Sequence, residues 1–93
     1  MPRARFVAGM LLFFFHLYNS TGLTPDEEGR ELESLSEARE CAIRDIRSVL
    51  CGDVEQGFID MRGRIEIAGE RDEALMTVSF ADAVDVRIEG DPA

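Results

Sequence analysis

The sequence contains no lysine, and all ten of its basic residues are arginine. These arginines form no basic patch, whereas nineteen acidic residues give a formal net charge of −9 and a pI of about 4.4. A charge of this sign repels the phosphates of nucleic acids and the surfaces of anionic membranes. We therefore expect neither nucleic acid nor a membrane among the partners of this protein.

Cysteine and histidine are also scarce. Cys41 and Cys51 fall in one predicted helix, where ten residues of helical rise place them about 15 Å apart, too far for a disulfide. Two free thiols are typical of a reducing cytoplasm. His16 is the only histidine, and the chain has no zinc-ligand spacing, no glycine-rich phosphate loop and no Ser-His-Asp order. The sequence predicts no metal, no cofactor, no catalytic residues and a protein that is not an enzyme.

The acidic residues form no recognisable cation site. Asp26, Glu27 and Glu28 precede Gly29, but an EF-hand loop needs alternating oxygen ligands and a distal glutamate, and that spacing is absent. We expect these three residues to form a solvated acidic turn. Asp82 and Asp85 near the end are interpreted as surface acids or as a helix cap.

One apolar stretch, MLLFFFHLY at residues 10–18, has three interpretations. Arg3 and Arg5 precede it as in a secretory signal, but no A-x-A cleavage pattern follows. The stretch is also too short to span a membrane as a helix, which takes about 20 apolar residues. Its aromatic residues favour a strand. We expect a strand and a cytoplasmic protein; the alternative is an exported or membrane-associated protein with residues 1–18 as its signal.

The rest of the chain alternates strand and helix patterns. Residues 19–22 predict a turn and 30–32 a short strand, while 34–54 predict a helix with Ser34 and Glu37 in capping-box spacing. Two strands follow around 64–67 and 75–80, joined by a charged turn. Residues near Phe80 favour a short helix, although Val84, Val86 and Ile88 also suit a strand. The sequence thus predicts an α+β fold, in the order strand, strand, helix, strand, strand.

The fold expected from this order is a small antiparallel sheet of three or four strands with one main helix packed on one face. A short C-terminal helical turn is expected after the last strand. Ninety-three residues make one domain. Its predicted bounds are residues 10–88, with an N-terminal extension at 1–9 and a tail at 89–93.

Several segments together resemble a known family. These are FFFHL at 13–17, DEEGREL at 26–32, the Leu35–Ala42 pattern L..AR..A, GRIEI at 63–67 and TVSFADAV at 77–84. In this order they resemble a domain of unknown function found in short uncharacterised alphaproteobacterial proteins. The resemblance covers residues 12–86 and implies a soluble bacterial protein, and it supports a strand at the start. It implies no activity and no catalytic residues. The chain departs from the family at its GERDE turn.

The face of the first strand that carries Phe14, His16 and Tyr18 is the candidate interaction site. One helix cannot cover both faces of a sheet, so these side chains are expected to be exposed unless the final segment covers them. We expect a non-enzymatic protein that binds another protein or itself, with self-association through this face as the preferred mode. An alternative, based on a more distant resemblance to the layout of HicB-type antitoxins, is a regulatory protein that neutralises a basic partner.

Overall fold

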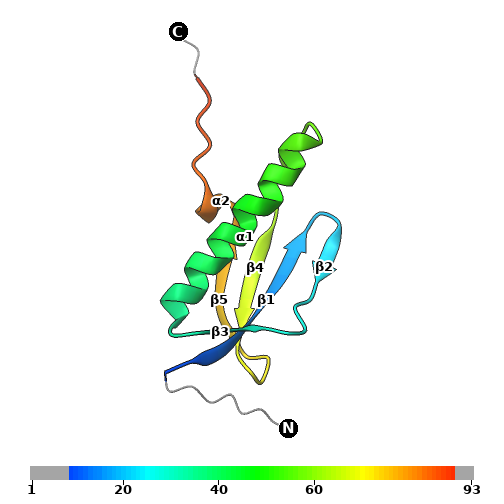
Figure 1. The fold of residues 1–93 in the computed structure, drawn as a ribbon. Helices are drawn as coiled ribbons and strands as arrows, with labels where there is room; N and C mark the ends of the chain where they lie inside the picture. The colour runs from blue at the N-terminus through cyan, green and yellow to red at the C-terminus, as the bar shows by residue number, and fades with distance from the viewer. Residues whose placement is uncertain (1–8, 90–93) are drawn as a thin grey trace.

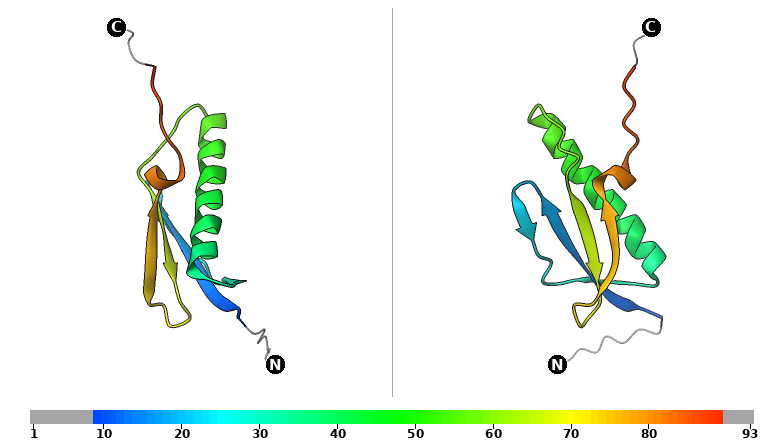
Figure 2. Two further views of the ribbon diagram at one scale, coloured as in Figure 1. Left: turned by 90° about the vertical axis from the view of Figure 1, so that its left-hand side faces the viewer. Right: turned by 180° about the vertical axis from the view of Figure 1, so that it is seen from behind.

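The computed structural model describes residues 9–89 and confirms the α+β fold (Figure 1). The elements in chain order are β1 (Leu11–Asn19), β2 (Gly22–Thr24), β3 (Arg30–Leu32), α1 (Leu35–Glu55), β4 (Arg64–Ala68), β5 (Ala74–Ser79) and α2 (Phe80–Ala83). Helix α1 forms one layer and the sheet forms the other, as Figure 2 shows from the side. The predicted extension and tail, apart from Gly9 and Glu89, lie outside the described residues.

The apolar stretch at the start of the chain folds as strand β1. Phe13 and Phe15 point toward α1 and are buried, whereas the residues between them point to the other face, as alternation along a strand requires. Within residues 9–89, no helix is both long enough and apolar enough to cross a membrane. The strand interpretation is therefore confirmed for this segment.

Strand β1 organises an antiparallel sheet in the order β2-β1-β4-β5. On one side it pairs along its length with β4, with Phe14 opposite Ala68 and Tyr18 opposite Arg64. On the other side it pairs with β3 near its start and with β2 near its end. Strand β2 was not predicted, and it makes five strands where three or four were expected. Its three residues are all exposed, so no hydrophobic alternation marks them in the sequence.

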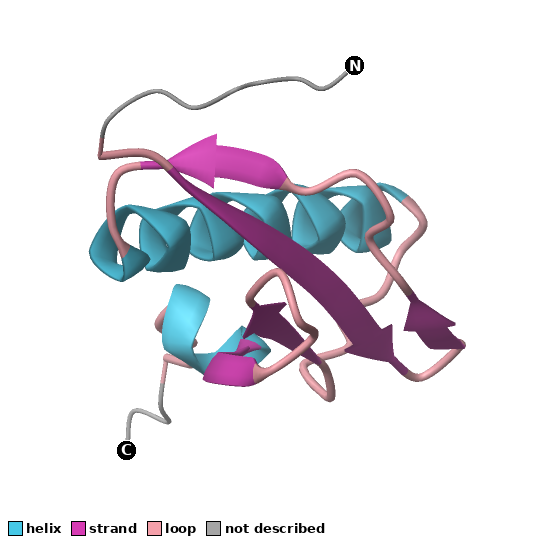
Figure 3. Ribbon diagram, turned by 90° about the horizontal axis from the view of Figure 1, so that it is seen from below, coloured by secondary structure: helices cyan, strands magenta, loops and turns pink. Residues whose placement is uncertain are grey.

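Helix α1 crosses the sheet, as Figures 1 and 3 show, and packs against α2 and against β3, β4 and β5. Its buried residues recur at helical spacing and form the centre of the core with the inward residues of the sheet. They are Ala38, Cys41, Ala42, Ile46 and Leu50.

The burial of Cys41 was not predicted. Both cysteines are free thiols, as expected from their separation. The helix ends beside Gly57, whose φ of +96° suits the left-handed residue after a helix, and Gly52 lies within it.

The predicted capping box at the start of α1 is present with one difference. The Ser34 hydroxyl accepts the amide of Glu37 at 3.1 Å, and the Glu37 carboxylate accepts the amide of Glu33 instead of that of Ser34.

We expect Ser34→Ala to lower the free energy of unfolding by about 1 kcal/mol, because the Glu37 amide loses its acceptor. Urea unfolding measures this loss. Ser36→Ala, at an exposed position in the same turn, is the control and is expected to cause no loss; equal losses would contradict this role of the cap.

The last elements close the other edge of the sheet. Strands β4 and β5 pair through the predicted turn at residues 69–73, where Asp72 has a φ of +64°. Helix α2 begins at Phe80 as predicted, and the Asp82 carboxylate caps it by accepting the amide of Ser79 at 3.0 Å. The Arg47 side chain donates to the carbonyl of Ala83 at 2.7 Å and ties α2 to α1.

Candidate functional site

The sheet has an inner face covered by α1 and an outer face that no other element of residues 9–89 covers. Phe14, His16 and Tyr18 lie on this outer face, as the strand alternation predicts, because their neighbours Phe13 and Phe15 are buried under the helix. Residues 84–89 do not cover it, since they project away from the sheet (Figures 1 and 2). The alternative in which the final segment makes these aromatic residues part of a core is therefore wrong for the described residues.

The outer-face residues are partly buried by one another and by polar neighbours. The rings of Phe14 and His16 stack with their centroids 6.5 Å apart. The Arg64 guanidinium lies 4.0 Å from the centre of the Tyr18 ring and also donates to Glu66 at 2.9 Å. These contacts hold the side chains in one arrangement. The outer face is therefore a preformed surface of aromatic and charged groups and not a loose apolar patch.

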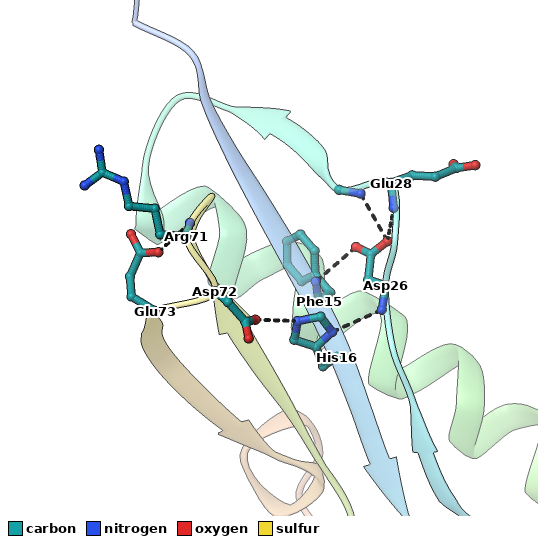
Figure 4. A network of polar contacts seen from close by, with 8 residues as sticks. Phe15, His16, Asp26, Glu28, Arg71, Asp72 and Glu73 are labelled. Atoms are coloured by element: carbon teal, nitrogen blue, oxygen red, sulfur yellow. Dashed lines mark hydrogen bonds and ion pairs between the residues drawn. The ribbon is translucent and has the colours of Figure 1, made fainter.

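His16 joins two loops to this face, as Figure 4 shows. Its Nδ1 accepts the backbone amide of Asp26 at 3.1 Å, and its Nε2 lies 3.6 Å from the carboxylate of Asp72 in the β4–β5 turn. A nitrogen that accepts a hydrogen bond carries no proton, so this geometry places the ring's proton on Nε2. The hydrogen bond ties the loop between β2 and β3 to β1, and the exposed carboxylate of Asp72 makes a close contact with the ring.

Asp26 fixes the loop between β2 and β3. One carboxylate oxygen accepts the amide of Phe15 at 3.0 Å, and the other accepts those of Glu28 and Gly29, each at 3.1 Å (Figure 4). Burial raises the pKa of Asp26, but these hydrogen bonds and the charge of Arg30 outweigh burial and hold the pKa below its ordinary value. The prediction of a solvated acidic turn is wrong for Asp26, because its carboxylate is enclosed by amides.

The polar groups of this network are engaged with the backbone and with one another. The carboxylate of Asp26 is occupied by three amides, and His16 is held between a backbone amide and Asp72 with no serine, threonine or cysteine side chain bonded to it. Among residues 9–89, no group of three His, Cys, Asp or Glu side chains could hold a metal ion. The chemistry of this site is hydrogen bonding that positions loops.

An open depression of about 430 Å³ lies on the inner face beside α1. Its polar groups are already engaged: Arg30 lies 4.5 Å above the Phe15 ring and pairs with Asp45 on α1, and Asp26 is bonded as described. The depression is lined by Phe15, Leu17, Thr24, Pro25, Asp26, Glu28, Gly29 and Arg30. Since Asp26 and Arg30 are both occupied, they offer no set of free polar groups that would orient a small ligand.

The outer face carries apolar side chains on β1, β2 and β5, and the loops at one end of it carry exposed carboxylates. Leu23 lies directly opposite Tyr18 and is 50% exposed, and Leu75 follows the same face on β5 at 39%. The acidic border is formed by exposed residues of the two loops that His16 contacts, Glu27, Glu70, Asp72 and Glu73, with Arg71 exposed among them. Aromatic and leucine side chains beside exposed, mostly acidic groups are typical of a protein interface. The sequence analysis identified the aromatic row of this face, but not its border.

The fold defines a class: a small α+β protein with an antiparallel sheet, one long helix on its inner face and a short helix at its C-terminal side. Residues 12–81 match the family described as a domain of unknown function, DUF6894, and the chain belongs to this family. The resemblance to a domain of unknown function is thereby confirmed. No significant match was found among curated proteins or among solved structures.

Proposed function

We propose that this protein is a non-enzymatic protein-binding module and that its outer sheet face is the binding surface. The observation that carries the proposal is that the partly buried aromatics Phe14 and Tyr18 and the exposed Leu23 and Leu75 share this face, beside the exposed carboxylates of the acidic border. The complementary partner is a protein that presents an apolar patch surrounded by arginine or lysine.

This proposal includes the antitoxin-like alternative, in which the protein neutralises a basic partner. The segment 26–37 supports a basic partner, because it contains six acidic residues and one arginine, and that arginine is engaged with Asp45. Face-to-face association of two copies is opposed by their acidic borders, which would meet across the interface. Self-association through the face is therefore the competing outcome of the experiment below.

A bacterial cytoplasmic location is part of the same proposal. Removal of residues 1–18 as a signal would delete nearly all of β1, the strand that pairs with β2, β3 and β4. The remaining chain would lose Phe13 and Phe15 from its core and would expose one edge of β4. Intact-mass measurement of the native protein tests this: retention of residues 11–18 supports the location, and their loss would contradict it.

The binding surface is tested by capturing proteins from the native host with matched baits. Wild type and Phe58→Ser, which changes an exposed phenylalanine outside the face, are expected to retain the same partner. Phe14→Ser/Tyr18→Ser is expected to weaken its retention by about tenfold or more, because hot-spot aromatics carry much of an interface's free energy. Circular dichroism confirms that each variant is folded, and Leu23→Ser is a second face variant that leaves β1 intact.

The captured protein is then purified, and its 1:1 binding is measured at two salt concentrations. We expect a basic protein whose affinity falls as salt rises, because the carboxylate border contributes long-range attraction. Equal retention by all baits would overturn the proposed surface. Gel filtration of the purified proteins tests the competing outcome. If wild type forms a dimer and Phe14→Ser/Tyr18→Ser does not, the face serves self-association and not the binding of a basic partner.

A further inference from the structure

The segment that follows α2, residues 84–89, has the pattern of a strand but no strand partner among the described residues. Val84, Val86 and Ile88 alternate with charged residues, and the backbone is extended at Val84, with φ −144° and ψ 155°. The side chains of Val86 and Ile88 are 62% and 84% exposed. We refer to residues 84–89 as the arm; Figures 1 and 2 show it leading away from the sheet.

The free edge of β5 offers a second unpaired feature. Within residues 9–89, β5 pairs on one side with β4 and has no strand on the other, and Figure 2 shows this edge unobstructed. Its sequence, ALMTVS, contains no charge, proline or glycine. Soluble proteins usually protect such edges with charges or prolines, or cover them. The opposite edge, by contrast, ends in the three-residue β2, and Pro25 follows it at once.

We infer that the arm of one copy adds as a strand to the β5 edge of a second copy, and that a two-fold axis makes the exchange reciprocal. Val84 packs against the core of its own copy, which leaves residues 85–89, about 17 Å of extended chain, to pair along the six residues of β5. The arm projects beyond the Ser79 end of β5, so it enters the edge of the second copy from that end and runs antiparallel to it.

The alternation of the arm matches the two faces of the sheet it would extend. With Val86 and Ile88 on the inner side, they continue the row of Met76 and Val78, which pack toward the core. The charged residues Asp85, Arg87 and Glu89 then face solvent on the outer side. Backbone hydrogen bonds supply the attraction, and the apolar row fixes the register.

Light scattering of the full chain over a dilution series tests this exchange. Wild type is expected to form a dimer with twice the 10.4 kDa mass of the chain. Val86→Asp/Ile88→Asp is expected to abolish the dimer, because the exchanged strand would place two carboxylates on the inner side. Asp85→Ser/Arg87→Ser, which changes the solvent side of the same arm, is the matched control and is expected to remain dimeric.

Hydrogen exchange provides a second measurement that does not depend on mass. The β5 amides that point to the free edge are expected to be protected at high concentration in wild type and to lose that protection in Val86→Asp/Ile88→Asp. A wild-type monomer at every concentration would overturn the exchange, as would a dimer unaffected by the arm substitutions. Phe14→Ser/Tyr18→Ser alters the proposed binding face and is expected to remain dimeric, so failure of one proposal is distinguishable from failure of the other.

Discussion

Gly63→Ala is expected to lower the free energy of unfolding by about 1–3 kcal/mol, which is large for one added methyl group. A Cβ at Gly63 would lie 2.7 Å from two ring carbons of Phe80. Phe80 is only 1% exposed and its amide donates to the carbonyl of Gly63 at 2.9 Å, so the ring has no free space into which it can move. The absence of a side chain at residue 63 is what allows α2 to pack against the start of β4.

Gly52→Ala is the matched control for this substitution. Gly52 lies inside α1, and a Cβ there would meet no atom within 4 Å. Alanine is expected to raise the free energy of unfolding by about 0.5–1 kcal/mol, because glycine costs more conformational entropy in a helix. Urea unfolding of the two variants should therefore give changes of opposite sign. A Gly63→Ala protein as stable as wild type would contradict the packing of Phe80.

Asp26→Ala is the second substitution with a large expected effect, a loss of about 2 kcal/mol in the free energy of unfolding. The amides of Phe15, Glu28 and Gly29 would lose their acceptor together. Phe15 lies on β1 between the segment that pairs with β3 and the segment that pairs with β2. Glu27→Ala, at the exposed next position, is the control and is expected to change stability by less than about 0.5 kcal/mol.

The loss caused by Asp26→Ala is expected to depend on pH. Because the pKa of Asp26 in the folded protein lies below its ordinary value of 3.8, its carboxylate stabilises the fold fully above that value. This contribution disappears as pH falls through the lowered pKa. The difference in unfolding free energy between wild type and Asp26→Ala should be constant near neutral pH and should narrow below about pH 4. A difference that widens in acid would contradict the hydrogen-bonded carboxylate.

Elements with a buried face could be predicted from the sequence, and elements without one could not. The alternation of β1 and the spacing of apolar residues along α1 are direct consequences of one buried side each. Strand β2 has three exposed residues, so its pairing with β1 leaves no trace in the sequence pattern. Its position depends on the turn at 19–22 and on the loop that Asp26 holds.

The candidate site was predictable only in part for a similar reason. The positions of Phe14, His16 and Tyr18 on the outer face follow from the period of a strand. The partners of His16 do not, because Asp26 and Asp72 come from loops ten and fifty-six residues away in the chain. The acidic border of the face forms only when those loops fold against β1. The net charge of the sequence therefore predicts an acidic surface but not where on the molecule the acidic residues gather.

The central claim, that another protein binds the outer face, is tested most directly by the single tyrosine of the chain. Protein labelled with 3-fluorotyrosine gives one fluorine resonance, from Tyr18 on that face near the end of β1. When the partner captured from the host is titrated in, we expect this resonance to shift or broaden and to saturate at one equivalent. If calorimetry shows the partner binding while the Tyr18 resonance stays unchanged, the interface lies elsewhere on the molecule and the proposed function of this face is wrong.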